Sequence, residues 1–160
     1  MSDEQSVQRA LPGLNEPAPA FDAPTTRGRK KLSDYAGRWL VLFSHPADFT
    51  PVCTTEFVAF AKAHDRFQKL SCDLLGLSID SIYSHLAWER NIKEKFGVEI
   101  PFPIIADLSM KVATAYGMIQ RDEHPALPQV GIGGQLDRAE DGARWHVGPS
   151  QLFHRLQLGP

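Results

Sequence analysis

Apolar residues form three short, nearly continuous runs in the first 120 residues, at positions 39–43, 72–80 and 101–106. Runs of this length are typical of strands that are covered on both faces, so we expect three buried strands. A shorter pair of strands is expected on either side of the turn at residues 25–31, with Gly28 at its tip. The basic residues of this turn favour a solvated hairpin tip over a nucleic-acid or lipid patch, because no aromatic residues are interleaved with them.

Between these runs, apolar residues recur at the three- and four-residue spacing of one helix face. The first predicted helix follows Thr50 and extends to about residue 70. The second is capped by Ser81 and ends at Gly97, and its expected buried face consists of Ile82, Leu86, Ile92 and Phe96. A third helix is predicted at residues 107–116. Strands that alternate with helices in this way indicate an α/β fold.

The pattern changes after Gln120. Residues 121–160 hold six glycines and four prolines, a quarter of that segment, whereas these two residue types make up about an eighth of the chain before it. Such a content favours irregular structure, and only residues 152–158 have the apolar spacing of a strand. We therefore divide the chain into a folded domain at 1–120 and an atypical segment at 121–160, and we expect the C-terminal strands of the sheet to be incomplete or altered.

Composition and charge restrict the function. With 160 residues, 42% hydrophobic content and a net charge of −2, the chain resembles an ordinary globular protein and offers no electrostatic case for binding nucleic acid or an anionic membrane. No stretch is long and apolar enough to span a bilayer, and the first residues lack an apolar export signal, so we expect a reducing cytoplasm. The two cysteines and six histidines lack the spacing of a metal site or a disulfide framework. His64, on the apolar face of the first helix, is expected to be a core histidine with satisfied hydrogen bonds.

Cys53 stands where a cysteine has chemical consequences. Thr50 is a suitable N-cap, Pro51 suits the first helical position, and Cys53 falls in the first turn. The free backbone N–H groups and the positive dipole end of a helix favour a thiolate over a thiol, and a thiolate is a nucleophile. A lone cysteine is more often a small buried hydrophobe, but a position at a helix start, soon after a buried strand, favours the nucleophile.

The residues around this cysteine resemble the active-site signature of the peroxiredoxins, in the form seen in the one-Cys branch of that family. The stretch from residue 43 to residue 56 reads Phe-Ser-His-Pro-Ala-Asp-Phe-Thr-Pro-Val-Cys-Thr-Thr-Glu and matches the pattern Pro-x-x-x-Thr-x-x-Cys in full. The likeness extends from about Leu14 to Gln120. It implies a thioredoxin-like fold with a central mixed sheet flanked by helices.

The resemblance implies a thiol-dependent peroxidase, without a cofactor, that reduces hydrogen peroxide and alkyl hydroperoxides. Cys53 would attack the peroxide and become a sulfenic acid, which an external thiol would reduce. Thr50 would align the sulfur with the O–O bond, Pro46 would shield the sulfur from water, and His45 would lie beside the pocket. The resemblance also implies a homo-oligomer, a dimer or a larger assembly.

Two features bear on how far the resemblance extends. Glu56 would orient an arginine that the family places near the sulfur, yet none of the arginines in the expected region is followed by an apolar strand: Arg121, Arg138 and Arg144. The alternative function is therefore a catalytically impaired, peroxiredoxin-like interaction protein.

Cys72 is not expected to be a resolving partner, because about seventeen helical residues place it ~25 Å from Cys53, whereas bridged Cα atoms lie within ~7 Å. Glu56 also occupies the second position of a would-be Cys-x-x-Cys, which disfavours a dithiol reductase.

Overall fold

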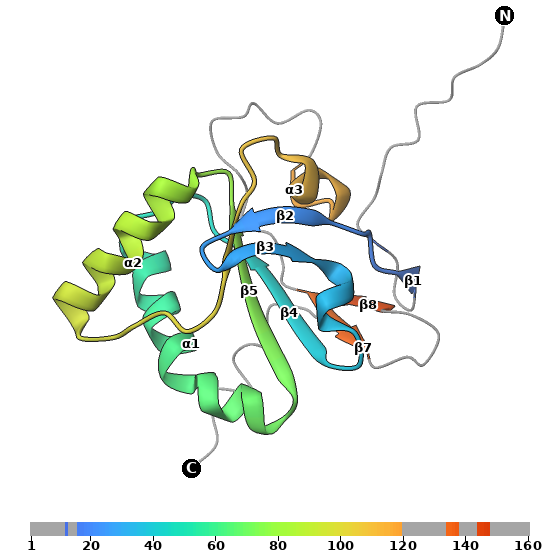
Figure 1. Cartoon of the computed structure of the whole chain (residues 1–160), viewed down its shortest axis with the longest axis horizontal. Helices are drawn as coiled ribbons and strands as arrows, with labels where there is room; N and C mark the ends of the chain where they lie inside the picture. Colours follow the sequence, from blue (N-terminus) through green and yellow to red (C-terminus); the bar gives the residue numbers. More distant parts are fainter. Residues whose placement is uncertain (1–11, 13–15, 120–133, 138–143, 148–160) are drawn as a thin grey trace, which may run out of the picture.

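The structure is a computed structural model that describes Pro12, residues 16–119, and the backbone of residues 134–137 and 144–147. In this part of the chain, strands and helices alternate as the sequence predicts (Figure 1). The strands are β1 (Glu16–Pro17), β2 (Asp22–Thr25), β3 (Gly28–Lys31), β4 (Trp39–Ser44), β5 (Cys72–Ser78), β6 (Ile104–Ala106), β7 (Gly134–Asp137) and β8 (Arg144–Val147). The helices are the 3-10 helix η1 (Leu32–Tyr35), α1 (Pro51–Lys69), α2 (Ile82–Phe96) and α3 (Lys111–Ala115).

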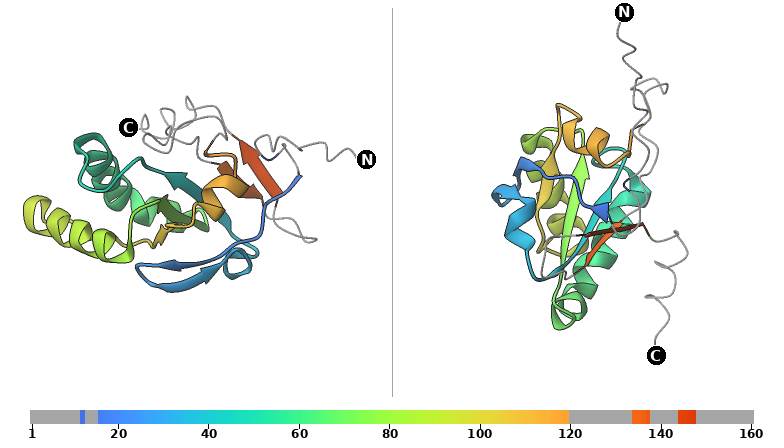
Figure 2. Two further views of the ribbon diagram at one scale, coloured as in Figure 1. Left: turned by 90° about the horizontal axis from the view of Figure 1, so that it is seen from above. Right: turned by 90° about the vertical axis from the view of Figure 1, so that its right-hand side faces the viewer.

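The described strands form one mixed sheet in the order β1-β8-β7-β4-β5-β6-β2-β3. Its centre is parallel, because β4 pairs with β5 from Trp39 to Ser44 and β5 pairs with β6. Antiparallel strands extend it on both sides, with β7 beside β4 and the β2–β3 hairpin beside β6. Helices α1 and α2 lie together on one side of the sheet (Figures 1 and 2). The expected α/β fold with a central mixed sheet flanked by helices is confirmed.

Successive residues of the central strands pack into two separate cores, one on each face of the sheet. The core against α1 and α2 includes Phe43, Phe57, Leu74, Trp88, Ile92, Phe102 and Ile104. The core on the other face, which α3 covers, includes Leu40, Leu42, Leu75, Leu77, Ile105, Val112 and Tyr116. Neighbouring residues such as Leu42 and Phe43 therefore face opposite cores, which explains why the apolar runs in the sequence are continuous rather than alternating.

The ends of α1 and α2 follow the predicted local signals. Thr50 occupies the N-cap of α1, and Pro51 is its first residue. Ser81 caps α2 by accepting the backbone N–H of Ser84 at 3.2 Å, and Gly97 ends that helix in the left-handed conformation, with φ of 66°. Each of these helices thus follows a strand of the parallel part of the sheet after a short loop at the carboxyl end of that strand.

The buried face of α2 differs from the expected one. Leu86 and Phe96 are 42% and 49% exposed, and the buried residues of the helix are His85, Trp88 and Ile92. Each residue advances about 100° around a helix, so a stripe through residue 85 is turned well away from one through residue 86. The prediction followed the apolar residues alone and left out His85, although this histidine is fully buried.

Helix α3 is shorter than predicted. It begins at Lys111 rather than directly after Asp107, and Met110 at its N-cap has a left-handed φ of 56°. Asp107 still stabilises the helix, because its Oδ2 accepts the backbone N–H of Ala113 at 2.8 Å. Among the described residues, no helix combines the length and the apolar character that crossing a membrane requires.

The structure describes two short strands after Gln120, where we expected incomplete or altered strands. β7 pairs with β4 over residues 40–42, β8 pairs with β7, and Arg144 opens β8. Whether the sheet is otherwise complete stays a prediction. These strands are four residues long and partly polar, so they are too short for apolar periodicity to indicate them. The strand expected at residues 152–158 lies outside the described residues.

Gly76 in β5 allows α1 to approach the sheet closely. A Cβ at this position would lie 3.1 Å from Cζ of Phe57. Phe57 is 1% exposed, and its ring packs against those of Phe43, Trp88 and Phe102, so it has little room to move aside. We expect Gly76→Ala to lower the free energy of unfolding by about 1–3 kcal/mol, as measured by urea denaturation.

The control for this prediction is the same substitution in a Phe57→Leu background, which removes the ring atom that the new methyl group would meet. The cost of Gly76→Ala should be smaller there, because the two positions are coupled through one contact. An equal cost in both backgrounds would mean that the contact with Phe57 is not the cause.

Candidate active site

Two loops meet at the carboxyl ends of the parallel strands, beside the starts of α1 and α2. The backbone N–H of His45 donates to the carbonyl oxygen of Leu77 at 3.0 Å and extends the β4–β5 ladder into the loop after β4. Further along this loop, the backbone N–H of Asp48 donates to Oδ2 of Asp80, in the loop after β5, at 3.0 Å. These bonds fix the residues that precede α1 against those that precede α2.

Cys53 lies in the first turn of α1 and is buried, with 5% of its surface exposed. The first helical hydrogen bond runs from the N–H of Thr54 to the carbonyl oxygen of Thr50, so the N–H of Cys53 is one that a helix leaves without a helical partner. The hydroxyl of Thr50 does not cap the helix, because it donates instead to the carbonyl oxygen of Ala47 at 2.9 Å. The proton of this hydroxyl is thereby engaged, and its oxygen presents lone pairs.

Phe49, in the loop between Asp48 and Thr50, has a strained backbone. Its φ is 62°, in the left-handed region that bulky residues rarely occupy. Its side chain is 52% exposed, so burial of the ring does not compensate a strain of about 1–3 kcal/mol. The compensation comes from the neighbours on each side, where Asp48 is bound to Asp80 and Thr50 to Ala47. The loop before Cys53 therefore has one defined shape.

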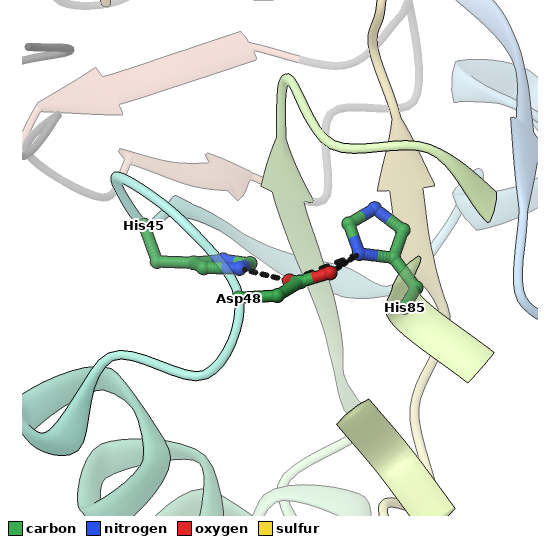
Figure 3. A group of neighbouring side chains, drawn as sticks. All are labelled: His45, Asp48 and His85. Atoms are coloured by element: carbon green, nitrogen blue, oxygen red, sulfur yellow. Dashed lines mark hydrogen bonds and ion pairs between the residues drawn. The ribbon is translucent and has the colours of Figure 1, made fainter. Parts of the chain in front are cut away.

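His45, Asp48 and His85 form a buried polar cluster beside this loop (Figure 3). Asp48 lies between the two imidazole rings, with Oδ1 2.8 Å from Nε2 of His45 and Oδ2 2.8 Å from Nδ1 of His85. The second ring nitrogen of His85, Nε2, lies 3.1 Å from the carbonyl oxygen of Ile105. The three side chains are at most 2% exposed. The cluster thus connects the loop after β4 with α2 and β6.

The histidines hold Asp48 in its ionised form. Burial of this carboxyl opposes ionisation, but the hydrogen bonds from His45 and His85 and the Coulombic attraction of His85 outweigh that effect and lower the pKa of Asp48 to about 2. The cluster therefore contains a carboxylate that is both buried and charged.

Trp88 connects the cluster to the first turn of α1. Its ring centroid lies 4.9 Å from that of His45 and 4.6 Å from that of Phe57. Its Nε1–H donates to Oγ1 of Thr54, the residue after Cys53, at 3.1 Å. Trp88 is fully buried, and its indole therefore contacts both the histidine cluster and the cysteine-bearing helix turn.

Residues 14–134 match the family model of the AhpC/TSA family. The chain belongs to this family. Among its relatives, a peroxiredoxin of Aquifex aeolicus is 65% identical over 118 residues, which cover 73% of this chain and 51% of that protein. A peroxiredoxin of Thermoplasma volcanium is 58% identical over 106 residues, or 66% of this chain and 52% of that protein. The chain thus spans about half the length of the curated relatives it matches.

Solved structures of family members share its fold. A yeast mitochondrial 1-Cys peroxiredoxin, described by its thiol-resolving mechanism via the glutathione and thioredoxin systems, has a TM-score of 0.76 and 36% identity over 92% of this chain and 76% of its own. The reduced 2-Cys peroxiredoxin of Plasmodium vivax has a TM-score of 0.68 and 27% identity over 90% and 96%. The resemblance to the peroxiredoxins and the expected thioredoxin-like fold are confirmed.

The four site residues predicted for this AhpC/TSA chain lie in one stretch, from the end of β4 to the first turn of α1: His45, Pro46, Thr50 and Cys53. Glu56, one turn further along α1, is exposed. The candidate arginines at positions 121 and 138 lie outside the described residues, and of Arg144 the structure describes the backbone. Which arginine completes the site therefore stays a prediction.

Sequence reasoning missed Asp48 and the position of His85. The sequence motif contains Asp48 without indicating a role for it, and His85 lacks the spacing of a metal ligand. One signal was available. Ser81 caps α2 next to the carboxyl end of β5, so a histidine one turn later lies at the same edge of the sheet as the motif. The sequence could therefore have predicted that His85 has a buried hydrogen-bond partner at that edge.

The cluster also has the composition of a metal site, which we did not expect from the sequence. One ligand atom from each of His45, Asp48 and His85 lies within 4.8 Å of the others. A histidine that binds a metal through one nitrogen usually donates the other N–H to an acceptor. His85 would meet this condition through Ile105, but Nδ1 of His45 is buried and has no partner among the described residues. The donor set therefore fits a hydrogen-bonded cluster better than a metal centre.

Cys72 and His64 are both at a distance from this site in the fold. Cys72 opens β5, at the opposite end of α1 from Cys53, and both cysteines are free. Burial raises the pKa of Cys72 to about 11, and nearby Asp73 adds to this effect, so its thiol is neutral at pH 7. His64 was expected to have satisfied hydrogen bonds, but it is half-buried and its Nδ1 has no partner among the described residues.

Acid should destabilise the protein through Asp48. A folded-state pKa of about 2, below the unfolded value, means that Asp48 contributes stability that is fully present above about pH 4 and is lost as the pH falls towards 2. A shift of this size corresponds to roughly 2 kcal/mol. We expect the free energy of unfolding, measured by urea denaturation, to fall over this pH range.

In Asp48→Asn the protein should be less stable at pH 7 and should show a weaker acid dependence below pH 4. Asp65→Asn, at an exposed position of α1, is the matched control and should retain the wild-type dependence. An Asp48→Asn protein with the full acid dependence would contradict the assignment.

Proposed function

We propose that the protein is a thiol peroxidase that reduces hydrogen peroxide and alkyl hydroperoxides through Cys53. One observation carries the proposal: Cys53 lies in the first turn of α1, behind a loop of fixed shape, within a fully matched motif of a chain that belongs to the AhpC/TSA family. The helix start supplies free N–H groups and the positive dipole end, which stabilise a thiolate and the developing negative charge of a reacting oxygen.

In the proposed reaction, the Cys53 thiolate attacks the terminal oxygen of the hydroperoxide. A sulfur–oxygen bond forms, the O–O bond breaks, and its electron pair leaves with the other oxygen, which takes up the proton that the thiol lost. The products are a Cys53 sulfenic acid and water or an alcohol. Two equivalents of an external thiol then return the sulfenic acid to the thiol, with formation of one disulfide between them and one water.

The neighbouring residues have separate roles in this proposal. The Thr50 hydroxyl already donates a hydrogen bond to the carbonyl oxygen of Ala47, so its oxygen can accept a hydrogen bond from the O–H of the hydroperoxide and orient the O–O bond. Pro46 has no N–H group and presents a rigid ring that shields the sulfur. His45 lies in the same loop, with Nδ1 unpartnered among the described residues.

The reductant is proposed to be external, because Cys72 is buried at the opposite end of α1. A glutathione or thioredoxin system, as described for the yeast 1-Cys neighbour, is the class of reductant that fits a chain without a nearby second thiol. We also propose a homo-oligomer, a reducing cytoplasm, and no nucleic-acid or membrane partner. The alternative of an impaired interaction protein is not favoured by membership of this enzyme family.

The division of the chain at Gln120 also stays a proposal. The family model continues to residue 134, fourteen residues past that boundary. If the segment after it does not supply an arginine near the sulfur, Cys53 has only the helix start and Thr50 to stabilise the developing charge. Single-turnover oxidation should then be markedly slower than in full-length relatives, because a charge-assisted hydrogen bond is missing in the transition state.

Replacing the two cysteines in turn tests the proposed nucleophile. Cys53→Ser should abolish peroxide consumption in the presence of excess dithiothreitol, whereas Cys72→Ser should retain most of it. Intact-mass analysis after one equivalent of hydrogen peroxide should show a gain of one oxygen in wild type and in Cys72→Ser. Equal loss of activity in both variants, with the fold intact by circular dichroism, would refute the role of Cys53.

The oxidised protein should contain no disulfide within the chain. Because α1 continues from Cys53 to Lys69, which is about 25 Å of helix, the two cysteines cannot reach bonding distance without loss of the helix. We expect a non-reducing peptide map of the oxidised protein to show unlinked Cys53 and Cys72 peptides. A cross-linked peptide within one chain would contradict this geometry.

A further inference from the structure

The first turn of α1 is not closed by the side chain at its N-cap. A threonine at an N-cap usually accepts, through its hydroxyl oxygen, the backbone N–H of the second or third helical residue. Thr50 makes no such bond, because its hydroxyl is directed to the carbonyl oxygen of Ala47. The second and third residues of the helix, Val52 and Cys53, therefore keep N–H groups that the cap does not occupy. A first turn of this kind needs another support.

Thr54 supplies that support from within the helix. It is the fourth residue of α1, and it is buried. Its backbone N–H donates to the carbonyl oxygen of Thr50 at 3.0 Å, and its hydroxyl donates to the same oxygen at 2.8 Å. One carbonyl oxygen thus accepts two hydrogen bonds from a residue one turn further along. These bonds close the turn that contains Cys53 and leave its N–H groups unoccupied.

Trp88 fixes the orientation of the Thr54 hydroxyl. An indole nitrogen only donates, and Nε1 of Trp88 lies 3.1 Å from Oγ1 of Thr54. The hydroxyl therefore accepts from the indole and donates its own proton to the carbonyl oxygen of Thr50. The indole is fully buried and packs against the ring of Phe57, so it has little room to turn away. A chain of hydrogen bonds thus runs from α2 through Thr54 to the N-cap of α1, and each bond strengthens the next.

The neighbouring Thr55 lacks this connection. Its hydroxyl also donates to a carbonyl oxygen of the preceding turn, that of Val52, at 2.7 Å, which is a local bond that threonine commonly forms in helices. Thr55 is exposed, and among the described residues no other element donates a hydrogen bond to it. Of these two adjacent threonines, Thr54 is therefore the one that joins the first turn to the core between the helices and the sheet.

We propose that Thr54 is a positioning residue for the peroxidase reaction. Oriented by Trp88, its hydroxyl holds the carbonyl oxygen of Thr50 and thereby the first turn of α1. The Thr50 hydroxyl and the unoccupied N–H groups of the turn then keep a fixed place relative to the sulfur of Cys53. The proposal rests on the proposed function, because it concerns the same reaction. Thr54 acts through its neighbours and does not itself touch the peroxide.

The direct test is Thr54→Val, because valine has the shape of threonine without the hydroxyl. Misplacement of reacting groups by about 1 Å is enough to slow a reaction strongly, so we expect single-turnover oxidation of Cys53 by hydrogen peroxide to fall by about 10- to 100-fold. Thr54→Ser keeps the hydroxyl and should retain most of the wild-type rate. Thr55→Val, in the same turn, is the matched control and should oxidise at the wild-type rate.

Alkylation of Cys53 by iodoacetamide separates alignment from thiolate formation. Alkylation needs the thiolate but no alignment of an O–O bond, so Thr54→Val should slow alkylation far less than oxidation by peroxide. An equal loss in both reactions would overturn the proposal, because the hydroxyl would then act on the charge of the sulfur. A wild-type rate of oxidation in a folded Thr54→Val protein would overturn it as well.

A double variant tests the structural alternative, in which Thr54 only satisfies the buried indole N–H. Thr54→Val leaves that donor without its acceptor, which is destabilising, whereas Thr54→Val combined with Trp88→Phe removes donor and acceptor together. We expect the double variant to oxidise as slowly as Thr54→Val. Recovery of the wild-type rate would refute the positioning role.

Trp88→Phe alone keeps the Thr54 hydroxyl and carries the same comparison if the valine variants do not fold. Without the indole to orient that hydroxyl, oxidation should slow more than alkylation, and an unchanged ratio of the two rates would contradict the proposal. A wild-type protein in which Cys53 does not react with peroxide would instead refute the proposed function, whatever the hydrogen bonds of Thr54.

Discussion

The parallel pairing of β4 with β5 is the constraint on which the rest of the structure depends. Parallel strands end at the same edge, so the loops after β4 and β5, and the starts of α1 and α2, are brought to one place. Cys53 comes from one helix start and His85 from the other. The close approach of Phe57 to Gly76 then sets the distance between α1 and the sheet.

The buried carboxylate of Asp48 fixes the local structure at this edge of the sheet. A buried carboxylate is costly unless it is paired, and the two histidine rings that contact Asp48 meet that requirement. The cluster therefore stabilises the fold only while every member is present. It also fixes the geometry of the loop in front of Cys53, where Phe49 has a backbone conformation that it would not adopt unaided.

Local signals in the sequence were sufficient to predict the elements that position the site. Thr50 and Pro51 predicted the start of α1, and Ser81 and Gly97 predicted both ends of α2, because caps act within a few residues. What depends on packing between distant segments was not predictable. The burial of His85 depends on Asp48, 37 residues earlier, and on Ile105, 20 residues later, and the strands β7 and β8 are too short to leave an apolar period.

The indole of Trp88 has a consequence for how the site can be observed. It is fully buried, lies 4.9 Å from the ring of His45, and donates a hydrogen bond to the residue beside Cys53. Trp39, by contrast, is half-buried and opens β4 at the far end of that strand. An indole held this close to an imidazole loses fluorescence when that ring gains a proton. Of the three tryptophans in the chain, Trp88 is therefore a built-in optical reporter of the charge on His45, while emission from Trp39 and Trp145 adds a background.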